Sequence, residues 1–224
     1  PPRSTLFPYT TLFRSRRMIV SVDMRRMNRI LWIDEENYLA SVEAGITGKQ
    51  LERELDARGY TSGHDPDSVE LSTLGGWIST NASGMKKNNY GNIEDIVLEA
   101  TLVTPSGAIE SKTLTPRNST GIPPRAFLFG SEGNFGIITK AVIKLHPRPE
   151  RREYGSLVFP SFARGVSYLK ALRQTRALPA SIRLVNNNEF RFGQALKPAP
   201  GFWKRLVGEL QKLIGGLRDR NIGV

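Results

Sequence analysis

The chain has 224 residues, a formal net charge of +11, no cysteine and 39% hydrophobic residues, an ordinary hydrophobic content for a globular protein. The absence of cysteine excludes a disulfide framework, thiol catalysis and a cysteine-ligated metal, and no apolar run approaches the roughly 20 residues that span a bilayer. The basic residues are scattered and collect near the two ends without the alternation of arginine and aromatic residues typical of RNA-binding proteins, so we expect no nucleic-acid partner.

The first 15 residues differ from the rest of the chain. The segment TLFPYTTLFRS, from Thr5 to Ser15, matches the translation of one reading frame of a common sequencing adapter. We therefore interpret residues 1–15 as a disordered, adapter-derived artefact and leave them out of the fold prediction. A genuine aromatic N-terminal arm is the alternative.

Alternating apolar and β-branched residues follow. They predict a strand in MIVSVD at 18–23 and two strands around a polar turn in RILWIDEENYLASVEAG at 29–45. A helix should come next, because Thr47 and Gln50 have the spacing of a capping box and Gly59 can end the helix.

The segment SVELSTLGGWISTNASG at 68–84 concentrates small and hydroxylated residues around a Gly-Gly pair. Ser72 or Thr73 can cap a helix here, and the first amide groups of that helix would face an anion such as a pyrophosphate. Few Cβ atoms stand between the main chain and a large ligand. We interpret the segment as a cofactor cradle; the alternative is a helix whose glycines serve packing alone.

The next segments alternate between loops and strands. MKKNNYGNIED at 85–95 is predicted to be a polar loop, IVLEATLVTPSGAIES at 96–111 a β-hairpin, and 114–124 a surface loop rich in turn-forming residues. FLFGSEGNFGIITKAVIKLHPRPE at 127–150 predicts a glycine-rich turn followed by a strand that stops at His146 and the prolines after it.

A cluster of proline and arginine at 147–152 marks a domain boundary. Beyond it the pattern predicts a strand at 155–159, a helix at 161–175 and a strand at 180–186. The segment FWKRLVGELQKLIGGLRDR at 202–220 has apolar residues at helical spacing. It predicts an amphipathic helix that packs on a partner element, with a membrane surface as the alternative.

The glycine-rich turn spaces Gly130, Gly133 and Gly136 as G-x-x-G-x-x-G, which is not the nicotinamide-dinucleotide fingerprint. Its backbone amides could meet a ligand beside Glu132, or the glycines could simply allow a tight entry into the strand. A nicotinamide-binding domain is therefore not predicted.

Acid and base candidates are few. His146 precedes a strand-ending proline and is interpreted as structural or solvated, whereas His64 in GHDPDS lies close enough to the cradle to contact a ligand. No nucleophile elbow and no zinc spacing occurs, so we expect neither a metal site nor a complete catalytic constellation. Arg183 alternates with Ile182 and Leu184, which directs it either to solvent or to a cavity between domains, where it could bind a phosphate or a carboxylate.

Three runs carry a resemblance to a known family: HDPDSVELSTLGGWISTNASGMKKNNYGNIEDIV, GSEGNFGIIT and PASIRLVNNNEFRFGQALKP. They resemble the alkyldihydroxyacetonephosphate synthases (alkylglycerone-phosphate synthases), flavoproteins with an FAD domain of the vanillyl-alcohol oxidase type. The resemblance implies an α+β fold, with a partial FAD-binding domain at 16–147 and the beginning of an α+β substrate or cap domain at 148–224. The family's first pyrophosphate loop falls upstream of Met18, and its C-terminal active-site residues fall beyond Val224. We therefore expect a fragment that is inactive alone.

The resemblance also assigns site residues by position. It places Arg183 in the substrate site and FAD contacts in three segments. The FAD contacts are Asp67, Ser68, Val69, Glu70, Leu71, Ser72, Thr73, Thr80, Asn81, Ala82, Ser83, Glu132, Gly133, Asn134, Phe135, Gly136, Ile137 and Ile138. Asn81, Asn134 and Phe135 stand where the family usually has arginine, threonine and leucine.

The family activity implied is an FAD-dependent exchange of the acyl group of acyl-dihydroxyacetone phosphate for a long-chain fatty alcohol, a non-redox step of ether lipid biosynthesis. The alternatives are an FAD-linked oxidase or dehydrogenase of small 2-hydroxy acids on the same fold, and a non-enzymatic basic binding module. A peroxisomal location follows from the family alone. The sequence also allows a homodimer and a peripheral contact with a membrane surface.

Overall fold

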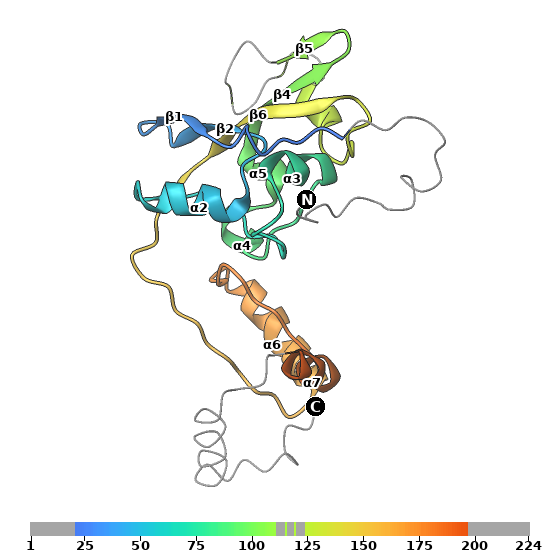
Figure 1. The fold of residues 1–224 in the computed structure, drawn as a ribbon. Helices are drawn as coiled ribbons and strands as arrows, with labels where there is room; N and C mark the ends of the chain where they lie inside the picture. The colour runs from blue at the N-terminus through green and yellow to red at the C-terminus, as the bar shows by residue number, and fades with distance from the viewer. Residues whose placement is uncertain (1–20, 111–114, 116–118, 120–123, 197–224) are drawn as a thin grey trace, which may run out of the picture.

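The computed structural model describes residues 21–110, 115, 119 and 124–196. Figure 1 shows a sheet with helices below it, and an extended segment that leads from the sheet to two further helices, α6 and α7. No helix within the described ranges is long and apolar enough to cross a membrane. The expectations for residues 1–15, for most of the loop at 114–124 and for the helix at 202–220 lie outside the described residues.

An antiparallel sheet of five strands forms the centre of the fold. In spatial order the strands are β1 (Ile30–Asp34), β2 (Leu39–Glu43), β6 (Ile137–Lys144), β4 (Val97–Thr104) and β5 (Gly107–Ile109). Both predicted hairpins, β1 with β2 and β4 with β5, are confirmed. The central strand β6 joins them, with Ala141 opposite Val42 on one side and Ala100 on the other.

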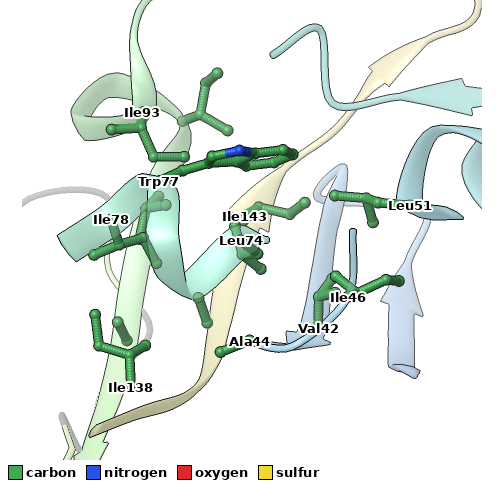
Figure 2. Close-up of a cluster of buried hydrophobic side chains, with 14 of the residues drawn as sticks. Val42, Ala44, Ile46, Leu51, Leu74, Trp77, Ile78, Ile93, Ile138 and Ile143 are labelled. Carbon is green, nitrogen blue, oxygen red and sulfur yellow. The ribbon is translucent and has the colours of Figure 1, made fainter. Parts of the chain in front are cut away.

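Helices cover one face of this sheet and close the hydrophobic core. Figure 2 shows the core around Trp77, where side chains from the sheet meet those of three helices. The fully buried members include Val42, Leu51, Leu74, Ile78, Ile93 and Ile143. Burial of each such side chain contributes about 1.5–3 kcal/mol, so this cluster fixes the position of the helices on the sheet.

The helix predicted after Thr47 is confirmed as α2 (Gly48–Asp56). The Thr47 side chain accepts a hydrogen bond from the Gln50 amide at 3.3 Å, as the capping spacing predicted. The second half of the capping box does not form, because the Gln50 side chain donates to the Asn28 carbonyl and to Glu54 instead.

Two details between the hairpins differ from expectation. The segment 85–95 was predicted to be a polar loop but contains two short helices, α4 (Lys87–Tyr90) and α5 (Ile93–Ile96). α5 forms because Ile93 and Ile96 are buried and Asn92 caps its first turn. The strand predicted to stop at His146 is followed directly by another short strand. This strand, β7 (His146–Pro147), pairs with β3 (Tyr60–Thr61) in a second, two-stranded sheet.

Between residues 151 and 196 the regular structure is helical. The predicted helix is confirmed as α6 (Phe162–Gln174), capped by Ser161, and α7 (Asn187–Ala195) is an additional helix. The strands predicted at 155–159 and 180–186 are wrong, and residues 21–23 of the strand predicted at 18–23 are not in a strand either. An alternating pattern becomes a strand only when a neighbouring strand completes its ladder, and the described residues provide none for these segments.

Candidate functional site

The glycine pair of the cradle opens α3 (Leu74–Thr80), and Thr73 caps it as predicted, with its hydroxyl accepting from the Gly76 amide at 3.3 Å. The expectation that the first amides face an anion is wrong. The Leu74 amide donates to the Ile46 carbonyl at 3.1 Å, and the Gly75 amide donates to the Ala44 carbonyl at 2.8 Å. The N-terminus of α3 is therefore bound to the segment that leaves β2.

Close packing explains the first glycine of the pair. A Cβ added to Gly75 would lie 3.0 Å from the Cβ of Ala44 and 3.2 Å from its carbonyl oxygen. Almost any side chain would push α3 away from the segment after β2. For Gly75 the packing alternative is therefore correct. A ligand would have to bind to the segments that flank α3.

The turn before α3 forms the first of these flanking segments. The Ser72 amide donates to the Ser68 carbonyl at 2.8 Å, and the Lys49 amide donates to the Val69 carbonyl at 2.9 Å, so the turn is fixed to the start of α2. The amides of Ser68, Val69 and Glu70 donate no hydrogen bond to any described residue. Ser68 and Glu70 are also exposed to solvent, which leaves a row of main-chain donors available to an anionic ligand.

The second and third predicted segments meet at the other end of α3. Asn81 ends the helix in the left-handed conformation, with a φ of 51°. The glycine-rich turn docks there: the Glu132 amide donates to the Ser79 carbonyl at 2.8 Å, and the Gly130 amide donates to the Ile78 carbonyl at 3.3 Å. Residues 80–83 and 132–138, 50 residues apart in sequence, are thereby brought together.

Within this pair of segments the residues have different surroundings. Gly133 and Phe135 are exposed, and their amides have no hydrogen-bond acceptor among the described residues. Ile138 is buried in the core, and a Cβ on Gly136 would lie 2.3 Å from the Val103 carbonyl oxygen. Gly136 and Ile138 therefore serve packing, and the exposed residues of the turn are the ones open to a ligand.

His64 is buried under the loop that follows α3. Its side chain is only 2% exposed, and within the described structure neither ring nitrogen has a hydrogen-bond partner. Burial lowers the pKa of His64 from 6.5 to about 4. Gly84 lies directly over the ring, since an added Cβ would be 2.9 Å from Nδ1. His64 is therefore a neutral imidazole with unused polar atoms next to the first flanking segment.

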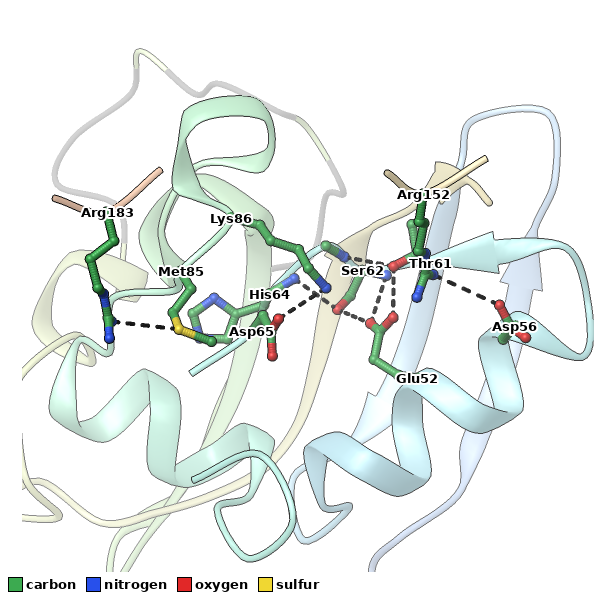
Figure 3. A network of polar contacts seen from close by, with 11 residues as sticks. Glu52, Asp56, Thr61, Ser62, His64, Asp65, Met85, Lys86, Arg152 and Arg183 are labelled. Carbon is green, nitrogen blue, oxygen red and sulfur yellow. Dashed lines mark hydrogen bonds and ion pairs between the residues drawn. The ribbon is translucent and has the colours of Figure 1, made fainter. Parts of the chain in front are cut away.

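A polar cluster holds the segment that leads to His64. Figure 3 shows the Glu52 carboxylate of α2 accepting from the Thr61 hydroxyl at 2.6 Å, from the Ser62 amide at 3.0 Å and from the Ser62 hydroxyl. The Ser62 hydroxyl in turn accepts from the His64 amide at 3.3 Å. The sequence prediction missed Glu52, because no local spacing relates a helical glutamate to a strand nine residues later.

His146, the second histidine, does not lie at these segments. It packs edge-on against Tyr90, with ring centroids 5.0 Å apart, and belongs to the short strand β7. Burial, together with the positive charge of Lys144, lowers its pKa. This environment agrees with the structural interpretation of His146.

Arg183 lies on an extended segment between α6 and α7 that reaches the loop after α3. Its guanidinium Nη2 is 3.6 Å from the Met85 sulfur (Figure 3). The same nitrogen is 3.9 Å from a carboxylate oxygen of Asp67. Nearby, the Asn88 side-chain amide donates to the Pro179 carbonyl at 3.0 Å. The structure thus brings the predicted substrate residue to the first predicted cofactor segment, across more than 100 residues of sequence.

The surroundings of α3 fit a large anionic cofactor. The turn before α3 and the glycine-rich turn docked at its other end carry main-chain amides with no acceptor among the described residues, and these amides can bind phosphate oxygens. The neutral His64, whose ring nitrogens have no partner in the described structure, precedes the first of these turns. The three segments that the sequence assigned to FAD all border this helix. The donors are small or main-chain groups, as contact with a dinucleotide requires.

Comparison with known proteins agrees with this geometry. A family model described as FAD binding domain matches residues 10–111, and one described as the C-terminal domain of FAD linked oxidases matches residues 148–216. The alkyldihydroxyacetonephosphate synthase of Caenorhabditis elegans is 48% identical over 188 residues, 84% of this chain and 32% of that protein. The Dictyostelium discoideum synthase is 43% identical over 187 residues, 84% of this chain and 30% of that protein.

A solved structure of an alkyldihydroxyacetonephosphate synthase superposes with a TM-score of 0.78 at 40% identity, covering 92% of this chain and 38% of that chain. Fold and site thus define an FAD-binding domain of the vanillyl-alcohol oxidase type, with helices on an antiparallel sheet. Within that class, the chain belongs to the alkyldihydroxyacetonephosphate synthase family. The chain spans about a third of the length of the curated relatives it matches.

Proposed function

We propose that the intact protein is an FAD-dependent alkylglycerone-phosphate synthase. It would exchange the acyl group of acyl-dihydroxyacetone phosphate for a long-chain fatty alcohol in ether lipid biosynthesis. The observation that carries the proposal is the position of Arg183, whose guanidinium lies 3.9 Å from Asp67 at the edge of the cofactor segments. Identity of 40–48% to three synthases over 84% of the chain supports the same activity.

The domains and the cofactor contacts are part of this proposal. Residues 16–147 would form the FAD-binding domain and 148–224 the start of the substrate domain; the second family match, which begins at residue 148, supports this boundary. FAD would lie along the segments 67–73, 80–83 and 132–138. The exposed amides before α3 and in the glycine-rich turn would bind its phosphates.

Arg183 would bind the phosphate of the substrate. A guanidinium can hold two phosphate oxygens at once, whereas its ion pair with Asp67 is long and both side chains are mostly exposed. Such a surface pair contributes at most about 1 kcal/mol, so a phosphate dianion can replace the carboxylate. When bound, FAD supplies the electron-accepting ring for the exchange, and this chain positions the substrate next to that ring.

Location and assembly follow the family proposal. The peroxisomal location is proposed on membership of the family alone. A basic chain, with a net charge of +11, suits a phosphorylated lipid substrate and a peripheral contact with an anionic membrane surface. A homodimer is part of the same proposal.

The test is an exchange assay with the intact protein loaded with FAD. Acyl-dihydroxyacetone phosphate and an isotopically labelled fatty alcohol are supplied, and mass spectrometry follows the labelled ether product and the released fatty acid. We expect both products in equal amounts, and we expect their loss in Arg183→Ala but not in Arg191→Ala, an exposed arginine of α7. Bleaching of the flavin by a small 2-hydroxy acid, without ether product, would instead identify an oxidase or dehydrogenase.

A further inference from the structure

We infer that Asn88 is a positioning residue that holds Arg183 in front of the cofactor segments. This inference rests on the proposed function and adds to it a residue outside the cofactor and substrate sites. The Asn88 side-chain amide donates to the Pro179 carbonyl at 3.0 Å, four residues before Arg183. The start of α4, which follows the cradle, is thereby joined to the segment that carries the proposed substrate-binding arginine.

The segment 177–186 needs such support because it contains no helix or strand. One side of it is fixed to α6, since Leu184 packs against Gly165, where an added Cβ would lie 2.7 Å from a Leu184 methyl carbon. Side chains alternate along an extended segment, so Arg183 points away from α6. It faces Met85 and Asp67 on the FAD-binding side.

On the side of the segment that faces the FAD-binding domain, the hydrogen bond from Asn88 is the contact with a defined geometry. Contact of the Arg183 guanidinium with the Met85 sulfur is weak, and the Asp67 carboxylate is 3.9 Å away. A side-chain amide donates to a carbonyl, whereas a carboxylate can only accept. Asparagine at position 88 therefore holds the Pro179 carbonyl, and aspartate at the same position would repel it.

The consequence for the reaction is specific to the phosphorylated substrate. Without the Asn88 bond, the segment leaves the loop more often and Arg183 is in place for a smaller fraction of the time. We expect KM for acyl-dihydroxyacetone phosphate to rise by less than about fivefold, the factor that corresponds to one hydrogen bond of about 1 kcal/mol, because KM follows the fraction of the protein in which Arg183 is in place. FAD affinity should stay unchanged, because Asn88 lies outside the three cofactor segments.

The experiment compares Asn88→Asp and Asn88→Ala with the matched control Asn89→Asp in the intact, FAD-loaded protein. Asn89 is exposed in the same helix α4, and its side chain has no hydrogen bond to a described residue. The first measurement is the rate of tryptic cleavage after Arg183, which reports how often the segment opens. We expect this rate to rise about fivefold in both Asn88 variants and to stay unchanged in Asn89→Asp.

The second measurement is the KM for the acyl substrate together with the dissociation constant of FAD. A raised KM with unchanged FAD binding in the Asn88 variants supports the inference. Equal cleavage rates in wild type and the Asn88 variants would overturn it, whatever the activity. If the wild-type protein makes no ether product, the proposed function fails, while the cleavage comparison still decides whether Asn88 holds the segment.

Discussion

The imidazole of His64 packs edge-on against the indole of Trp77, with ring centroids 4.8 Å apart. Trp77 is a core residue of α3, and His64 lies at the start of the segment that leads to Asp67, the first of the proposed FAD contacts, so the pair connects the core to the candidate site. Because no described group accepts or donates at either ring nitrogen, protonation of His64 would place an unpaired charge in the core.

The stability of the fold should therefore depend on pH through His64. Burial lowers its pKa from 6.5 to about 4, so the unfolded chain takes up this proton first. The contribution is fully present above pH 6.5 and is lost as the pH falls toward 4, on the order of 3 kcal/mol. Urea unfolding of wild type and His64→Phe across this range measures it, and parallel pH profiles of the two proteins would contradict the prediction.

Glu43 should stabilise the fold through its charged form, and this contribution, like that of His64, should be lost in acid. Hydrogen bonds from Arg29 lower the pKa of this buried carboxylate below 4.5. Its contribution is present above pH 4.5 and disappears as the pH falls through the lowered pKa. Glu43→Gln should lower the free energy of unfolding at pH 7 by about 2 kcal/mol. Glu153→Gln, which removes an exposed ion pair with Arg151, should change it by less than about 0.5 kcal/mol.

Gly75→Ala should destabilise the protein by about 1–3 kcal/mol, because the new methyl group would press on Ala44. The control is Gly193→Ala in α7, where no described atom outside the backbone of α7 lies within 4 Å of the added Cβ. That change should stabilise the helix by up to about 1 kcal/mol. Thermal unfolding of both variants is the measurement, and an equal effect of the two would show that α3 is not closely packed on its neighbour.

Glu52→Ala should cost about 2–3 kcal/mol, since Thr61 and Ser62 lose the acceptor that holds the segment before His64. Glu54→Ala on the same helix removes a single bond with Gln50 and should cost less than about 1 kcal/mol. Denaturant unfolding compares them. If Glu54→Ala lowers the free energy of unfolding as much as Glu52→Ala does, the loss arises from α2 itself and not from the polar cluster.

Local signals predicted much of this fold. The two hairpins and the caps at Thr47 and Thr73 follow from residues within a few positions of each other, and each is confirmed. The same rule could have found α7, because Asn186 and Glu189 form a capping box at its start. Apolar alternation at 155–159 and 180–186 failed as a predictor because a strand also needs a partner.

The parts of the site that were missed depend on distant residues. The amides of α3 were expected to face a ligand, but Ala44 and Ile46, about 30 residues earlier, accept from them. The Asn88 contact with Pro179 spans 91 residues. The residue pattern alone indicated a ligand at 68–84 and at the glycine-rich turn, but only the resemblance assigned individual FAD contacts, since small residues indicate close approach without saying what approaches.

The most direct test of the account is a titration of the folded, intact protein with FAD, followed by flavin absorbance and fluorescence. We expect a yellow protein that binds about one FAD per chain, with a flavin spectrum shifted from that of free FAD. A protein that is folded by circular dichroism but remains colourless and binds no added FAD would contradict the assignment of the segments around α3 to this cofactor.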